Sequence, residues 1–208
     1  MKISKQEVLD KVYTADNHED LMDAYKDWAG DYDGDTVQKF GYVAHEVSAK
    51  ALNKFMPDTD AVILDAGCGT GLVGEVLNKM GYDKIDALDY SKEMLVEAES
   101  KGIYGACIQA DLSKTLNMQE DTYDAVICVG TFTYGHVGPE GFDELIRITK
   151  PGGRICFTIR DGAFEDYDYR SHMVKLEQNG TWELLEMADA PYLAKEDVNC
   201  KLCTYAVK

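Results

Sequence analysis

Three glycines at alternate positions follow a short apolar run in residues 62–71, which read VILDAGCGTG. The run is typical of a buried strand, and helical spacing of apolar residues begins at Leu72. Gly67, Gly69 and Gly71 allow a tight turn between the two, and their missing side chains let a ligand approach the backbone. The amides that open a helix point at whatever occupies such a turn. The segment therefore predicts a ligand site between strand and helix.

Two ligand classes use a turn of this kind, and the glycines alone do not separate them. Gly69-x-Gly71-x-x-Gly74 satisfies the dinucleotide fingerprint, with Asp89 placed 20 residues after Gly69. S-adenosylmethionine would instead lay its methionine and ribose there. Asp65 favours this second class, because a carboxylate opposes a pyrophosphate but attracts an ammonium and a sulfonium. A unit-charge pair at ~4 Å is worth about 4 kcal/mol at a dielectric near 20. The structural alternative is that Asp65 only accepts hydrogen bonds from loop amides.

Two further acids end the next two predicted strands. Asp89 is placed to accept hydrogen bonds from both hydroxyls of a ribose, which methyl transfer and hydride transfer have in common. The alternative is an acid at a helix N-terminus beside Ser91. Asp111 ends the third strand and could meet an adenine amino group, but a loop or cap role fits the sequence equally well.

Apolar runs alternate with helical stripes from residue 61 onward, which indicates strands separated by helices. The five predicted strands span residues 61–66, 84–89, 106–110, 123–129 and 154–160. Connections of this length predict a parallel sheet with right-handed crossovers. After a turn at residues 150–153 and a helix near residues 169–178, the runs 182–187 and 199–207 predict an antiparallel hairpin at the sheet edge. We expect an α/β fold: a Rossmann-like, mostly parallel seven-stranded sheet with this terminal hairpin and helices on both faces.

The first sixty residues have a different pattern, which predicts two or three helices ahead of the sheet. Apolar residues recur at helical spacing in two sets, Leu21, Tyr25, Trp28 and Tyr32, then Val37, Phe40, Ala44, Val47, Ala51 and Phe55. We expect residues 1–60 to form an N-terminal helical lid and residues 61–208 to form the sheet domain, together as one compact unit.

At these motifs the chain resembles the class I S-adenosylmethionine-dependent methyltransferases. The matching segments are residues 65–71, 89–91 (DYS), 109–112 (QADL) and 151–153 (PGG), in the family's order and at plausible spacing. The resemblance runs from about Tyr25 to the C-terminus, and it implies S-adenosylmethionine as cofactor and S-adenosylhomocysteine as product. The cofactor-binding residues expected on this basis are Tyr32, Asp65, Gly67, Gly69, Gly71, Asp89, Tyr90, Met94, Asp111, Leu112 and Val129.

A narrower resemblance rests on three other segments. Residues 25–33 (YKDWAGDYD), 131–137 (TFTYGHV) and 158–160 (TIR) are similar to the methyltransferase-like proteins named after the Williams–Beuren syndrome chromosomal region. That group implies cofactor binding more firmly than it implies a particular substrate.

Methyl transfer from a sulfonium is an in-line displacement, so the protein mainly positions donor and acceptor and excludes water. No metal is required, and a base matters only if the acceptor carries a proton. His136 is the candidate base because histidine titrates near neutral pH, although it could equally be a loop histidine without a catalytic part. The acceptor is expected beyond the C-terminal ends of the strands. The expected substrate-binding residues are Tyr25, Trp28, Thr131, Tyr134 and Arg160.

The aromatic residues before the sheet have two interpretations. Tyr25, Trp28 and Tyr32 could close over the crevice and favour a sulfonium through cation–π attraction of about 0.5–2 kcal/mol. Packing of the helix onto the sheet is an equally good account of Tyr25 and Trp28, whereas we assign Tyr32 to the ligand.

Composition narrows the partners and the compartment. The formal net charge is −17 over 208 residues, which disfavours nucleic acid and anionic lipid and leaves a small molecule as the expected acceptor. No signal peptide or membrane-spanning stretch is evident, so we expect an intracellular, cytoplasmic protein whose six cysteines are thiols. Cys200-x-x-Cys203 lacks the second pair of ligands that a zinc site needs.

Three other functions stay open at this point. A nicotinamide-dependent oxidoreductase is supported by the Gly69-x-Gly71-x-x-Gly74 match and opposed by Asp65. A non-catalytic partner protein that binds S-adenosylmethionine is compatible with the absence of an unmistakable base. A protein-methylating enzyme is the weaker third option. The sequence leaves open the acceptor atom and the oligomeric state, since the negative charge favours cationic or neutral acceptors while Arg160 favours a carboxylate.

Overall fold

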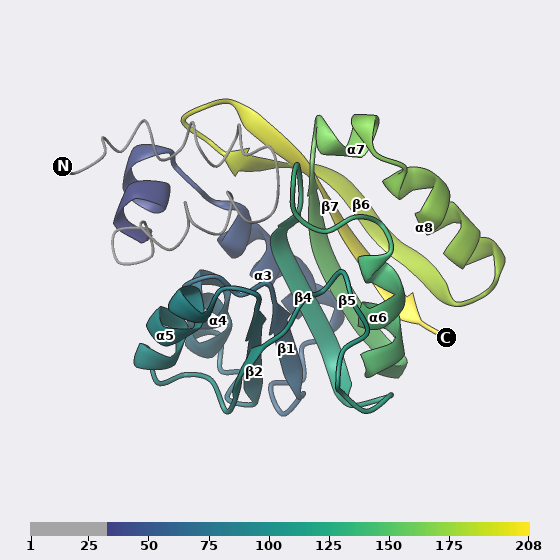
Figure 1. Ribbon diagram of the computed structural model, residues 1–208, viewed down its shortest axis with the longest axis horizontal. Helices are drawn as coiled ribbons and strands as arrows, with labels where there is room; N and C mark the ends of the chain where they lie inside the picture. The colour runs from purple at the N-terminus through teal and green to yellow at the C-terminus, as the bar shows by residue number, and fades with distance from the viewer. Residues whose placement is uncertain (1–32) are drawn as a thin grey trace.

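The computed structural model describes residues 33–208, which form a twisted seven-stranded sheet with helices on both sides (Figure 1). The strand order is β3-β2-β1-β4-β5-β7-β6. The strands are β1 (Ile63–Ala66), β2 (Ile85–Asp89), β3 (Cys107–Gln109), β4 (Tyr123–Phe132), β5 (Thr149–Arg160), β6 (Trp182–Leu193) and β7 (Val198–Val207). The helices are η2 (Gly34–Lys39), α3 (Ala44–Phe55), α4 (Leu72–Lys79), α5 (Lys92–Ser100), α6 (Gly141–Ile148), α7 (Ala163–Asp166) and α8 (Tyr169–Gln178).

The first five strands run parallel and the last two do not. Parallel pairing joins β3, β2, β1, β4 and β5, whereas β7 pairs antiparallel with both β5 and β6. The predicted Rossmann-like sheet with a terminal hairpin is therefore confirmed. All C-terminal ends of the parallel strands meet at one edge of the sheet, which is where open α/β sheets place their ligands.

Two apolar clusters explain why the strands are almost wholly hydrophobic. Leu64 belongs to a cluster that includes residues of α6 and α8, while its neighbour Ile63 belongs to a second cluster with residues of α3 and α4. Successive strand residues point to opposite faces, so both faces of the sheet must be covered. Figure 1 shows α3, α4 and α5 on one side of the sheet and α6 and α8 on the other.

Several element boundaries differ from those expected from the sequence. β4 continues to Phe132, and β5 begins at Thr149, so that it includes the expected turn at residues 150–153. There the pairing of β4 with β5 shifts register between Tyr123 and Ala125, and Gly152 has a positive φ of 80°. The pairing with β4 goes from Thr149 directly to Arg154, so residues 150–153 form an irregularity inside β5 where the chain bends locally.

Helices before β1 are confirmed only within the described residues. The buried side chains of α3 are Ala44, His45, Ser48, Ala49 and Leu52. The expected stripe is therefore rotated, because Val47 and Phe55 are only partly buried and Val37 is exposed. Tyr25, Trp28 and Tyr32 lie outside the described residues. The division at residue 60 stays a prediction, although α3 packs in the same cluster as β4.

Two further features concern the surface and the cysteines. Within residues 33–208, no helix combines the length and the apolar character needed to cross a membrane. The spacing of Cys200 and Cys203 along β7 places their side chains on opposite faces of the sheet. The two thiols therefore cannot chelate one metal ion.

Candidate functional site

The glycine turn between β1 and α4 is hydrogen-bonded to the end of β2. The amides of Gly67 and Cys68 both donate to the Leu88 carbonyl, at 2.7 and 3.0 Å. The Gly69 amide donates to Oδ2 of Asp89 at 2.8 Å. The turn therefore crosses the C-terminal edge of the sheet, as the sequence predicted.

Glycine is required at two of these positions for different reasons. A Cβ on Gly67 would lie 2.1 Å from the Thr131 hydroxyl oxygen, so β4 approaches the turn too closely for any side chain. Gly69 has a positive φ of 54°, and a Cβ there would meet no described residue within 4 Å. Within the described part of the chain its backbone therefore borders space in which a ligand could lie against it.

Asp89 is half-buried and accepts hydrogen bonds with both carboxylate oxygens. Oδ2 receives the Gly69 amide and Oδ1 receives the Ser91 amide, each at 2.8 Å. Burial raises the pKa of Asp89, while the amides of Ser91, Gly69 and Tyr90 oppose that rise. Each oxygen has two lone pairs, so the carboxylate can still accept a ribose hydroxyl. Asp89 therefore holds the turn in place, and its role toward a ribose stays a prediction.

Asp65 lies beneath the turn and is fully buried. Its Oδ2 accepts a hydrogen bond from the Tyr104 hydroxyl at 2.7 Å. Its Oδ1 has no hydrogen-bond partner within the described part of the chain. Burial raises the pKa of Asp65 to about 7, although the Tyr104 hydroxyl and the Gly74 amide lower it. The full negative charge assumed from the sequence is therefore present only above neutral pH.

Tyr104 accounts for the third glycine of the dinucleotide fingerprint. A Cβ on Gly74 would lie 2.2 Å from the Tyr104 hydroxyl oxygen, and one on Gly71 would lie 3.0 Å from the ring. Both glycines therefore make room for a tyrosine that reaches Asp65. The spacing that resembles a dinucleotide motif has a packing cause in this chain.

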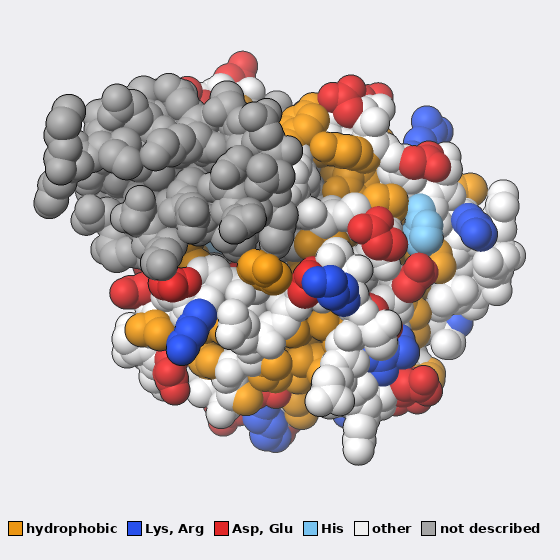
Figure 2. All heavy atoms as spheres, in the orientation of Figure 1, with side chains coloured by type: hydrophobic (Ala, Val, Ile, Leu, Met, Phe, Trp, Pro, Cys, Tyr) orange, Lys and Arg blue, Asp and Glu red, His pale blue; other side chains and the backbone are white. Residues whose placement is uncertain are grey.

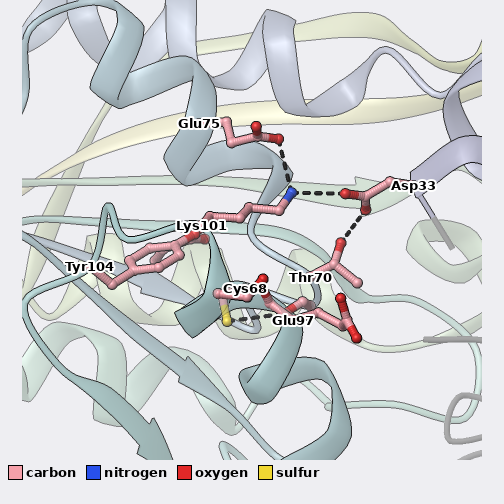
Figure 3. A network of polar contacts seen from close by, with 10 residues as sticks. Asp33, Cys68, Thr70, Glu75, Glu97, Lys101 and Tyr104 are labelled. Atoms are coloured by element: carbon pink, nitrogen blue, oxygen red, sulfur yellow. Dashed lines mark hydrogen bonds and ion pairs between the residues drawn. The ribbon is translucent and has the colours of Figure 1, made fainter. Parts of the chain in front are cut away.

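A network of polar contacts anchors the side of the turn (Figure 3). Lys101 Nζ lies 2.8 Å from carboxylate oxygens of both Asp33 and Glu75. The Thr70 hydroxyl, inside the glycine turn, donates to Asp33. Burial disfavours the charged form of Lys101, but the two carboxylates raise its pKa overall. The network joins the start of the described chain to the turn, α4 and the end of α5.

The remaining expected cofactor residues lie around the ends of β2, β3 and β4. Met94 is buried in α5, and its amide is capped by the Ser91 hydroxyl at 3.2 Å. Leu112 and Val129 are buried, whereas Tyr90 is 42% exposed. The exposed aromatic ring of Tyr90 lies next to Asp89 in the chain, whereas Leu112 and Val129 are part of the apolar interior.

Asp111 makes the contacts of a turn residue. Its Oδ1 accepts from the Ser113 amide at 2.9 Å, and its Oδ2 lies 2.9 Å from Lys114 Nζ. Burial opposes ionisation, but these partners keep the pKa of Asp111 below its usual range. The structure thus supplies the partners of the loop role that the sequence left open, and the adenine role stays a prediction.

A second group of predicted residues lies where β4 and β5 end. The Tyr134 hydroxyl donates to Asp166 at 2.7 Å, and the Arg160 guanidinium carbon lies 6.0 Å from the Tyr134 ring centre. His136 Nδ1 lies 2.8 Å from the Tyr134 carbonyl oxygen. Thr131, which lies inside β4 rather than after it, touches Gly67 and so links this group to the glycine turn. Tyr134, His136 and Arg160 are therefore neighbours, as expected.

The bulge in β4 next to this group is also fixed by side chains. Gly130 has a positive φ of 82°, and its amide donates to the Thr158 hydroxyl at 3.0 Å. A Cβ on Gly130 would lie 3.0 Å from the Tyr192 hydroxyl and 3.5 Å from that of Tyr42. Two tyrosines from outside the predicted site thus reach the end of β4.

Sequence reasoning missed the side chains that support the turn from below and from the side. Tyr104 and Lys101 lie between α5 and β3, in a short segment with no periodicity that marks them. Thr70 was overlooked within the glycine motif, and Asp33 within the segment 25–33. Only the folded arrangement shows that they converge.

The face shown in Figure 2 mixes acidic and basic side chains. Apolar side chains gather over α7 near the top of the view, at the end of the sheet that carries Tyr134. Tyr134 and Tyr167 are 37% and 44% exposed, with ring centres 5.8 Å apart. Exposed aromatic rings at a strand edge are suited to contact with an organic ligand.

Known proteins share both the sequence and the fold. A methyltransferase-domain family model matches residues 63–153. Human methyltransferase-like protein 27 is 36% identical over 166 residues, and the match covers 76% of this chain and 66% of that protein. The malonyl-[acyl-carrier protein] O-methyltransferase of Buchnera aphidicola is 27% identical, with 76% and 63% covered. The chain thus spans about two thirds of the length of these relatives.

A solved structure agrees with the fold. The crystal structure of an S-adenosylmethionine-dependent methyltransferase from Aquifex aeolicus superimposes with a TM-score of 0.62 at 18% identity, covering 88% of this chain and 98% of that one. The strand order, the glycine turn and these relatives agree. The chain belongs to the class I S-adenosylmethionine-dependent methyltransferases.

Proposed function

We propose that the chain transfers a methyl group from S-adenosylmethionine to a small-molecule acceptor by in-line displacement. When bound, S-adenosylmethionine supplies a methyl group that is already activated by its sulfonium. The task of the protein is to position the two reactants and keep water away. The observation that carries the proposal is the glycine turn, whose Gly69 backbone faces space that no described residue fills, next to the buried Asp65 and the half-buried Asp89.

The residues around the turn fit this cofactor. The N-cap residue of α4 is Gly71, which has no side chain to cap the helix, so the amides there suit a carboxylate. Asp65 lies beneath the turn, its Oδ1 has no hydrogen-bond partner among the described residues, and its carboxylate favours positive charge above it. Asp89 would accept hydrogen bonds from the ribose hydroxyls, and the exposed Tyr90 follows it in the chain. The same carboxyls would oppose a pyrophosphate, which argues against a nicotinamide dinucleotide.

A small acceptor is supported by charge and by one relative. The net charge of −17 disfavours a nucleic acid substrate. The Buchnera relative is named for O-methylation of a malonyl group on a carrier protein. Tyr134, Arg160 and the exposed Tyr167 would supply an aromatic surface with one cation at the acceptor side. An acceptor with an aromatic or carboxylate group suits this surface best.

His136 is the proposed general base. A backbone carbonyl only accepts hydrogen bonds, so the contact with the Tyr134 carbonyl requires the proton on Nδ1. In the neutral ring Nε2 then carries the lone pair. This tautomer is the one that a base facing an acceptor hydroxyl needs.

Three finer statements belong to the same proposal. The similarity to methyltransferase-like protein 27 is compatible with the narrower resemblance of residues 25–33, 131–137 and 158–160. The six cysteines of the sequence, all of which lie within the described residues as thiols, support a reducing, cytoplasmic location. Residues 1–60 would act as a lid, with η2 and α3 as its base.

Direct binding and transfer assays test the proposal. Calorimetry is expected to show binding of S-adenosylmethionine and S-adenosylhomocysteine, and fluorescence titration is expected to show no binding of reduced nicotinamide cofactor. Incubation with methyl-labelled donor and fractionated metabolites is then expected to yield a labelled small molecule. Nicotinamide binding without donor binding would refute the assignment. Donor binding with label found only on protein, or nowhere, would favour the protein-methylating or non-catalytic alternative.

A further inference from the structure

Tyr104 is the one residue whose side chain we find donating a hydrogen bond to Asp65 within the described residues. It lies between α5 and β3 and reaches across to Oδ2 of Asp65 at 2.7 Å. Its ring fills the space left by the absent side chains of Gly71 and Gly74. Figure 3 shows it beside the Lys101 network, on the same side of the turn. The side chain therefore contacts the turn, the start of α4 and the carboxyl at once.

The groups that face Asp65 pull its ionisation in both directions. Burial and the negative charge of Asp89, on β2, favour the protonated form. The Tyr104 hydroxyl, the Gly74 amide of α4 and the positive charge of Lys101 favour the ionised form. The thiols of Cys68 in the turn and Cys128 on β4 also lie nearby, and the charge on Asp65 helps raise the pKa of each.

We propose that Tyr104 is a positioning residue of the cofactor site, which keeps the Asp65 carboxyl ionised beneath the glycine turn and so sets the pH range for binding the cationic donor. The inference rests on the proposed function. Oδ1 of Asp65 has no hydrogen-bond partner among the described residues, so the Tyr104 hydroxyl is the one side-chain donor that stabilises its charge there. Tyr104 touches no reacting atom and acts only through Asp65.

The direction of the pH dependence follows from this arrangement. Asp65 is half-ionised near pH 7, because its pKa is about 7, and it gains negative charge as the pH rises. Donor affinity should therefore increase through this range. Removal of the Tyr104 hydroxyl raises the pKa further, and each unit lowers the ionised fraction about tenfold at pH values below both pKa values. Affinity is then lost near neutral pH and recovered at alkaline pH.

The test compares three variants with the wild-type chain. Tyr104→Phe keeps the ring that packs under the turn and removes only the hydroxyl. Asp65→Asn leaves an acceptor for Tyr104 but no charge at any pH. Tyr82→Phe is the matched control, because the buried Tyr82 also donates its hydroxyl to a side chain, Asn53 at 2.9 Å, away from the site. Dissociation constants for S-adenosylmethionine are measured by calorimetry at pH 7 and pH 9.

At each pH, the dissociation constant of a variant is compared only with that of the wild-type chain. The ammonium group of S-adenosylmethionine titrates equally in both measurements, so its effect cancels in this ratio. Tyr104→Phe is expected to bind about fivefold or more weakly at pH 7 and within about twofold of wild type at pH 9. Asp65→Asn should bind S-adenosylmethionine weakly at both pH values, and Tyr82→Phe should bind it as tightly as the wild-type chain at both.

Two results would overturn the inference alone. One is a Tyr104→Phe variant that binds like wild type at pH 7, and the other is an equal loss at both pH values, which would indicate a purely structural role. A wild-type chain that binds no S-adenosylmethionine at either pH would overturn the proposed function and this inference with it. Thermal melting of each variant checks that it is folded.

Discussion

At the scale of single residues, the two aspartates under the glycine turn differ in what surrounds them. Asp89 is held by two backbone amides and remains half-exposed to a ligand. Asp65 is fully buried, receives one phenol hydroxyl and has an unpaired Oδ1 within the described chain. Backbone amides are fixed donors, whereas a phenol can be removed by one substitution. The charge at Asp65 is thus more easily changed than the charge at Asp89.

Replacement of Asp89 by alanine should weaken donor binding by about tenfold or more, as expected for the loss of a charged hydrogen bond. Calorimetry with S-adenosylhomocysteine measures the effect. Asp86→Ala is the control, because Asp86 lies on the same strand and accepts from Tyr123 at 3.1 Å, away from the turn. Wild-type affinity in Asp89→Ala would disprove the ribose assignment.

Replacement of His136 by alanine should reduce methyl transfer by about 10²-fold or more while donor affinity stays unchanged, because a base acts on the acceptor only. The comparison is kcat against the dissociation constant of the donor. His172→Ala is the control, since His172 pairs with Asp143 on α6 at 3.2 Å, away from the acceptor side. Unaltered turnover in His136→Ala would remove this residue from the mechanism.

At the scale of elements, the glycine turn depends on segments far from it in sequence. Asp33 begins the described chain, Thr70 lies in the turn, Glu75 lies on α4 and Lys101 caps α5. A single lysine therefore joins three elements by two ion pairs. Lys101 is only 16% exposed, so these pairs are less screened by solvent than the other lysine pairs of the surface.

Lys101→Met should lower the free energy of unfolding by about 2 kcal/mol, because it leaves two carboxylates side by side without their cation. Lys54→Met is the matched control: its pair with Glu186 is equally short at 2.7 Å, but Lys54 is 58% exposed. The free energy of unfolding of Lys54→Met should fall by less than about 1 kcal/mol. Urea denaturation measures both, and equal losses would show that the Lys101 network is no more than a surface feature.

At the scale of the whole molecule, the sheet buries a carboxyl group whose ionisation destabilises the folded state. Both faces of the parallel strands are covered by apolar clusters, and Asp65 is the buried carboxyl within β1. Burial of a carboxylate with a raised pKa means that the folded state binds more protons than the unfolded chain between pH 3.8 and about 7. The contribution of Asp65 to stability therefore decreases as the pH rises through that range.

Asp65→Asn should accordingly stabilise the fold at pH 8 and have little effect at pH 4, where the carboxyl is neutral in the folded state. The difference between the ordinary pKa and about 7 sets a ceiling of about 4 kcal/mol on this gain. Melting temperatures at the two pH values measure it. A variant that is less stable than wild type at pH 8 would show that the charge on Asp65 is not a burden to the fold.

The sequence by itself determined the architecture and the cofactor class. Apolar runs alternating with helical stripes predict a parallel sheet because each strand covered on both faces must be hydrophobic throughout. The glycines between β1 and α4, followed by Asp89, mark the turn because only glycine allows that backbone path. These are local signals, carried by neighbouring residues.

Only the tertiary structure decided the electrostatics of the site. Tyr104 meets Asp65 across 39 residues, and Lys101 meets Asp33 across 68, contacts that no periodicity encodes. The sequence shows that Asp65 is an acid, but the degree of its burial and its one phenol partner decide at which pH it is charged. Charge in a protein interior depends on the surroundings of a group, and those surroundings exist only once distant segments have packed together.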